Sequence, residues 1–102
     1  MAKSLTLLKK SDLLKSLKSI PQWSVPAKGT LLQKSIVFTD HIDALVFIAR
    51  ITVHAQVLNH HPEIIFTYKK VKVILTTHEC KGISLLDIEF AKRIDLLITK
   101  SG

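Results

Sequence analysis

The longest regular pattern of apolar residues runs from His41 to Asn59 and predicts an α-helix that Thr39 or Asp40 caps. Apolar side chains recur at three- and four-residue spacing on two faces of this helix. A helix that is apolar over so much of its circumference is buried on more than one side. One sheet from a chain of 102 residues covers a single side, so we expect a second subunit to cover the other. The first face carries Ile42, Leu45, Val46, Ala49, Val53 and Val57. We assign the second face to the subunit contact, and it carries Phe47, Ile48, Ile51, Ala55 and Leu58.

Two further helices are predicted near the ends of the chain. The first begins at Ser11, a residue type that caps helices, and stops before Pro21, because proline disfavours helical geometry in the residue preceding it. The last runs over about residues 85–99. Ser84 and Asp87 stand at its start with the spacing of a capping box, in which aspartate replaces the usual glutamate.

Three segments between these helices have the character of β-strands. They cover residues 30–40, 63–70 and 71–79, and the last of them alternates inward and outward positions along its length. The order of helix, strands, helix, strands and helix predicts an α+β fold, with an antiparallel sheet and helices packed on one face. No change of composition divides the chain, so residues 1–102 are predicted to form one domain, with residues 1–10 as a frayed tail.

Composition and charge narrow the class of protein. Hydrophobic residues make up 47% of the chain, and the single cysteine, Cys80, excludes an intrachain disulfide and favours a reducing compartment. No segment reads as a secretory signal or a membrane span, so we expect a cytoplasmic protein without a membrane partner. The net charge of +7 favours anionic partners in general, but the lysines are not clustered with aromatic residues, so nucleic acid is not the expected partner.

Three histidines are the candidate chemical groups. His60 and His61 follow the long helix, whose C-terminal carbonyls favour a charged imidazole, and Pro62 then turns the chain away. His78 lies near the end of a predicted strand. Converging imidazoles would form an acid–base group that titrates near neutral pH, whereas the alternatives are three separate polar residues or a zinc site completed by Cys80. Adjacent histidines are poor joint ligands for one metal ion, which argues against zinc.

Short motifs, taken together, carry a resemblance to a known family. They are LNHHPE (58–63), YKKV (68–71), TTHEC (76–80), GIS (82–84) with Asp87, and FAKRI (90–94). The histidine pair before proline, combined with the later Thr-His, is far more specific than any single histidine. On these motifs the chain resembles the pterin-4a-carbinolamine dehydratase family over roughly residues 20–98.

The resemblance implies a fold and a reaction. The expected fold is an α+β domain with a four-stranded antiparallel sheet and three helices on one face, assembled as a homodimer or homotetramer in the cytoplasm or nucleus. The expected reaction removes water from a 4a-hydroxytetrahydropterin, such as 4a-hydroxytetrahydrobiopterin, and gives the quinonoid dihydropterin in tetrahydrobiopterin recycling. Such a dehydratase, a hydro-lyase, is expected to use no metal and no organic cofactor.

The resemblance also assigns roles to residues of the catalytic site. His60 and His78 match the acid–base catalysts, and His61 matches the histidine that helps hold the pterin. Expelling hydroxide from C4a needs a proton on the departing oxygen and loss of a proton from the adjacent ring nitrogen, which two imidazoles in opposite protonation states supply. Asp87 matches a supporting aspartate, although the capping box explains it equally well. The other implied substrate contacts are Asn59, Thr76, Thr77 and Glu79.

Two positions depart from the family pattern, and one alternative function stays open. Gln56 stands where many members carry an acidic residue, and Ile64 replaces an aromatic residue, which is expected to loosen one wall of the pterin pocket. Some animal members bind a homeodomain transcription factor as a dimerisation cofactor. That non-catalytic interaction module has no use for the histidines, and no feature of the sequence favours it.

Overall fold

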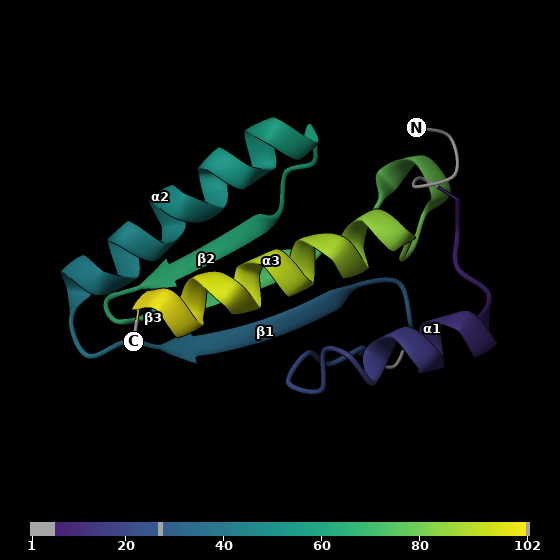
Figure 1. The fold of residues 1–102 in the computed structure, drawn as a ribbon, viewed down its shortest axis with the longest axis horizontal. Coiled ribbons are helices and arrows are strands. Elements are labelled where there is room, and N and C mark those ends of the chain that lie inside the picture. Colours follow the sequence, from purple (N-terminus) through teal and green to yellow (C-terminus); the bar gives the residue numbers. More distant parts are fainter. Residues whose placement is uncertain (1–5, 27, 102) are drawn as a thin grey trace.

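The computed structural model describes residues 6–26 and 28–101 of the chain. In chain order the elements are α1 (Lys10–Leu17), β1 (Leu32–Val37), α2 (His41–Leu58), β2 (Glu63–Thr67), β3 (Lys70–Leu75), the 3-10 helix η2 (His78–Cys80) and α3 (Leu85–Ser101). Figure 1 shows α3 crossing the sheet with α2 beside it, while α1 lies apart near the start of β1. The predicted α+β class is confirmed. Of the predicted tail, residues 1–5 lie outside the described ranges, and Leu7 forms a backbone bridge with Ser84.

The central strand of the antiparallel sheet is β3, and the strand order is β1-β3-β2. Leu32 at the start of β1 lies opposite Leu75 at the end of β3. Beyond Leu75 the backbone leaves the ladder, makes a single bridge from Thr77 to Gly82, and enters η2. The strand predicted over residues 71–79 is therefore too long at its C-terminal end.

The sheet has three strands in the part of the chain that the structure describes, and not the four that we expected. Next to β1, Ser24 and Gln33 exchange two backbone hydrogen bonds of 2.9 Å, but the pairing stops at this one bridge. Pro21 and Pro26 flank the bridge, and proline has no N–H to donate to a longer ladder. The prediction of a fourth strand is wrong for this reason.

The hydrophobic core lies between the sheet and the two long helices. On β3, the side chains of Val71, Val73 and Leu75 alternate into this core. From α2, Phe47 and Ile51 are fully buried in the same cluster. The face of α2 that we assigned to a subunit contact is thus the face packed on this chain's own core, and that assignment is wrong.

The opposite face of α2 is exposed. Val57 is 73% exposed, Val53 64% and Ile42 62%, so an apolar stripe runs along the outside of the helix. By length and composition alone, α2 is also apolar enough to cross a membrane, which differs from the sequence-based expectation. Its other side packs on the core, and it carries Asp43 and Arg50.

The helix starts differ in how well the sequence predicts them. Asp40 caps α2 as expected, because its carboxylate accepts a 2.8 Å hydrogen bond from the backbone N–H of Asp43. In α1 the helix begins at Lys10, and no side chain at the capping position, Lys9, bonds to the first turn. The predicted cap at Ser11 is wrong, because Ser11 already lies inside the helix.

Candidate active site

A tight turn after α2 sends one histidine of the pair into the protein. Asn59 adopts a left-handed conformation with φ of 52°, which asparagine tolerates better than most residues. The backbone N–H of His60 then donates to the carbonyl of Ala55 at 3.0 Å, the bond that defines a Schellman helix end. The turn, followed by Pro62, leaves His60 only 8% exposed, whereas His61 is exposed.

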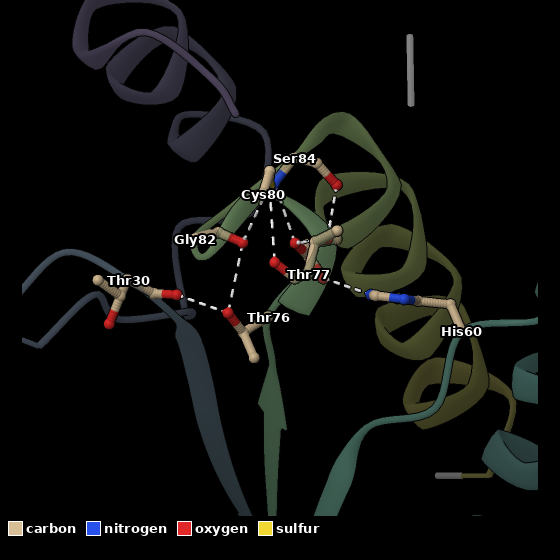
Figure 2. A network of polar contacts seen from close by, with 8 residues as sticks. Thr30, His60, Thr76, Thr77, Cys80, Gly82 and Ser84 are labelled. Atoms are coloured by element: carbon tan, nitrogen blue, oxygen red, sulfur yellow. Dashed lines mark hydrogen bonds and ion pairs between the residues drawn. The ribbon is translucent and has the colours of Figure 1, made fainter. Parts of the chain in front are cut away.

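The buried histidine contacts an aspartate in the first turn of α3. Nε2 of His60 lies 2.6 Å from Oδ1 of Asp87, whose side chain is fully buried. The other carboxylate oxygen accepts the hydroxyl of Thr77 at 2.6 Å and the backbone N–H of Ser84 at 3.0 Å. Because the one hydroxyl proton of Thr77 goes to Asp87, the Ser84 hydroxyl donates to Thr77 across 2.7 Å. Figure 2 shows this network joining the end of α2, the end of β3 and the start of α3.

The same network caps α3. The bond from the Ser84 N–H to Asp87 is one half of the predicted capping box. In place of the other half, the Asp87 N–H donates to the backbone carbonyl of Ser84 at 3.1 Å. Asp87 therefore serves the helix cap and His60 together, one carboxylate oxygen for each.

The bond to Asp87 also fixes where the His60 ring carries its proton. An ionised carboxylate only accepts hydrogen bonds, so opposite an ionised Asp87 the Nε2 atom carries the hydrogen and donates it. Within the described residues Nδ1 makes no hydrogen bond, and no buried side-chain nitrogen there lacks a partner. Nδ1 therefore lies where solvent reaches it, and it is the ring atom available to take up or release a proton.

The other predicted site residues lie at the same end of the sheet. Glu63 begins β2 opposite Ile74, so His61 and Thr76 stand just beyond the point where β2 and β3 stop pairing. His78 begins η2 directly after this point and is exposed. The fold thus brings the two halves of the histidine motif to one end of the sheet, together with exposed Asn59 and Glu79.

Two positions differ from their sequence-based interpretation. Thr77 was expected to contact substrate, but its side chain is fully buried and its hydroxyl is bound to Asp87 and Ser84. Its role in holding Asp87 was missed, although Thr77 continues the inward alternation of Val71, Val73 and Leu75 beyond the end of β3. Ile64 lies opposite Val73 and packs against the core. The isoleucine that replaces the family's aromatic residue therefore changes packing at the edge of the core and not an exposed pocket wall.

Two of the side chains in the zinc alternative make other contacts. His60 is bound to Asp87, and the thiol of Cys80 points at the carbonyls of Thr77 and Gly82, at 3.6 and 3.7 Å (Figure 2). Within residues 6–26 and 28–101, no three His, Cys, Asp or Glu side chains are grouped so as to hold a metal ion.

Comparison with known proteins decides the family. The sequence profile described as "Pterin 4 alpha carbinolamine dehydratase" matches residues 6–97. This chain belongs to the pterin-4a-carbinolamine dehydratase family. The resemblance seen in the motifs is confirmed, and the match extends to α1.

Several relatives match most of the chain. A protein of Sulfurisphaera tokodaii is 38% identical over 90% of this chain and 97% of its own length. A protein of Hydrogenovibrio crunogenus is 43% identical over 80% of this chain and 73% of its own length. Both carry the name "Putative pterin-4-alpha-carbinolamine dehydratase".

Solved structures share the fold. The crystal structure described as a transcriptional coactivator/pterin dehydratase from Brucella melitensis matches with a TM-score of 0.87 and 29% identity, over 90% of this chain and 98% of that one. A pterin dehydratase-like protein, described as a RuBisCO assembly factor in the alpha-carboxysome, matches with a TM-score of 0.66 and 22% identity, over 74% of this chain and 88% of that one. The second likeness is one of fold alone.

Proposed function

We propose that this dehydratase family member removes water from a 4a-hydroxytetrahydropterin by histidine acid–base catalysis. The buried pair of His60 and Asp87, at 2.6 Å, carries the proposal. A buried carboxylate bound to one imidazole nitrogen holds the ring in a single tautomer and stabilises the imidazolium that forms when the other nitrogen takes a proton. His61 and His78, which are exposed at the same end of the sheet, are the further imidazoles of the proposal.

The elimination needs two proton transfers. The C4a–O bond breaks with its electron pair on oxygen, and the oxygen takes a proton from the imidazolium of His78 and leaves as water. The electrons of the adjacent N–H bond form the new C=N bond, and its proton passes to Nδ1 of His60, opposite Asp87. His61 holds the pterin, and exchange with solvent restores both protonation states. Each transfer contributes about 10²–10⁴-fold to the rate.

Stopped-flow loss of carbinolamine absorbance tests this function directly. Adding the protein should accelerate the loss, and His60→Ala and His78→Ala should each slow the catalysed reaction by about 10²-fold or more. His54→Ala is the matched control, because His54 lies within α2 and takes no part in the network. Full activity in the His60→Ala/His78→Ala double variant would end the acid–base assignment.

We further propose that the protein acts as a homodimer or homotetramer in the cytoplasm or nucleus. The exposed apolar stripe of α2, with Ile42, Val53 and Val57, supports a contact between copies. Its exposure is otherwise costly for a protein in water.

A second candidate function is that of an interaction module. The same stripe on α2 favours it, as does the likeness to a structure described as a transcriptional coactivator/pterin dehydratase. Such a module would leave the histidines without a role. It predicts that carbinolamine loss is no faster with the protein than without it, whereas the enzyme predicts acceleration.

A further inference from the structure

A cavity of about 660 Å³ opens between α1, the loop before β1 and the turn after η2. Its volume lies within the range of about 300–1,000 Å³ that is usual for small-molecule sites. None of the histidines lines it, and neither does Asp87, so the proposed dehydration makes no use of it.

The body of the cavity is apolar. Five leucines of the segment 7–17 line it, together with Val25 and Pro26. Leu7 and Leu14 are 53% and 56% exposed although they line the cavity, so apolar surface there is left uncovered. A ligand with a hydrocarbon body would remove this surface from water.

The charged groups of the cavity are all positive. Lys10, Lys28 and Lys81 line it, and no aspartate or glutamate does. All three lysines are exposed, and none forms an ion pair with another residue in the described part of the chain. Lysine lays its hydrocarbon stem along apolar walls and keeps its ammonium group in water. The cavity therefore combines an apolar interior with cationic groups suited to an anion at its mouth.

We propose that this cavity binds an amphiphile of fatty-acid type, with an unbranched hydrocarbon body and one carboxylate. A small inorganic anion would leave the leucines uncovered, and a neutral hydrocarbon would leave the lysines unused. The carboxylate makes exposed ion pairs with the lysines, which salt screens, so binding weakens as ionic strength rises.

The cavity wall is also tied to the end of β3. The hydroxyl of Thr76 donates to the carbonyl of Thr30 at 2.7 Å and lies 3.3 Å from that of Gly82, and both of these residues line the cavity (Figure 2). Backbone amides around this wall therefore report on occupancy without any measurement of catalysis.

Titration of the full-length, nitrogen-15-labelled protein with octanoate, followed by amide resonances, tests the site. The signals of Gly29 and Gly82 should shift saturably, while that of Tyr68, in the turn at the other end of the sheet, should stay in place. Decanoate should bind roughly tenfold more tightly than octanoate, because two more methylene groups are buried. Octan-1-ol should bind more weakly than octanoate, and inorganic phosphate should leave both glycine signals unchanged.

Matched variants separate charge from apolar contact. Lys10→Glu and Lys28→Glu should each weaken octanoate binding by roughly three- to tenfold, whereas Lys15→Glu, on the same helix but outside the cavity, should change it less than twofold. Leu14→Asp changes an exposed side chain and should abolish binding. All four variants should retain the dehydratase rate, so failure here is distinct from failure of the proposed function.

Several results would overturn the proposal. One is equal affinity for octan-1-ol and octanoate, and another is the absence of any saturable shift at Gly29 and Gly82. Binding to phosphatidylglycerol vesicles without binding to free octanoate would assign the surface to a membrane. A loss of mass in light scattering on Leu14→Asp, with octanoate inert, would assign it to a second copy of the chain.

Discussion

Replacing Asp87 with asparagine tests whether the carboxylate sets the tautomer of His60. The backbone N–H of Ser84 can only donate, so the asparagine oxygen must take the position of Oδ2 that accepts it. The amide NH₂ then faces Nε2 of His60, 2.6 Å away in the native protein. A donor at that place forces Nε2 to become an acceptor and moves the ring proton to Nδ1.

The rate effect follows from this change of tautomer. With a hydrogen already on Nδ1, His60 has no lone pair there to accept the proton of the substrate nitrogen, and no carboxylate stabilises an imidazolium. The loss should approach the whole contribution of one acid–base group, about 10²–10⁴-fold. The folded state should lose about 1–3 kcal/mol as well, because three hydrogen bonds to a buried charged acceptor are weakened.

Two measurements on one sample separate these effects. Stopped-flow kinetics gives the rate, and imidazole nitrogen-15 shifts report which nitrogen of His60 carries hydrogen. The control is Asp95→Asn, also on α3, where the native carboxylate accepts Trp23 Nε1 and Lys34 Nζ, each at 2.9 Å. It should lower stability and leave the rate unchanged. A folded Asp87→Asn protein with the native rate, or with hydrogen still on Nε2, would refute the tautomer mechanism.

Three further outcomes are expected. Light scattering should give at least twice the monomer mass of 11.5 kDa. Val53→Glu on the exposed stripe of α2 should reduce the measured mass. A monomeric native protein would contradict the subunit contact. A stable pterin should shift the imidazole resonances of His60, His61 and His78 together. The resonances of His54 and of His41, which is bound to the carbonyl of Tyr68, should stay nearly unchanged. The reverse pattern would place the pterin elsewhere. Phe47→Ala should lower the free energy of unfolding by about 3–5 kcal/mol in chemical denaturation, and a loss below about 1 kcal/mol would mean that Phe47 is not central to the core.

Local pattern predicted the type and order of the helices and strands, but not all of their ends and not how they pack. The helical spacing after Asp40 placed α2 almost to the residue, because period and cap agree there. The spacing did not predict which of the two apolar faces of α2 packs on the sheet. The face with Phe47 does so because Ala44 and Ala55 on the same side are buried small residues that let the helix approach closely, and a count of apolar positions does not weigh side-chain size.

The candidate site was predictable as a set of residues but not as a geometry. The paired histidines pointed to the end of the sheet where His60 meets Asp87, since the same turn that ends α2 begins β2. The contact from His60 to Asp87 joins residues 27 positions apart, and no local spacing encodes it. The alternation through Thr77 was misread as a longer strand, because an inward-pointing threonine has the same period whether it packs in a sheet or holds a carboxylate.

The aspartate that closes the α3 capping box, at the third residue of the helix, has an evolutionary consequence. Glutamate is the usual residue there, and for the helix alone it would be an acceptable exchange. One additional methylene, however, moves the carboxylate by about 1.5 Å, and His60 would lose its partner. If His60 carries the proposed chemistry, selection for a more stable α3 is blocked at Asp87, and it has to act on residues such as Leu85 and Glu89, which are exposed in the same helix. Family members that have lost the dehydratase reaction would no longer need an aspartate at this position. A glutamate there would therefore indicate a member that has become a binding protein.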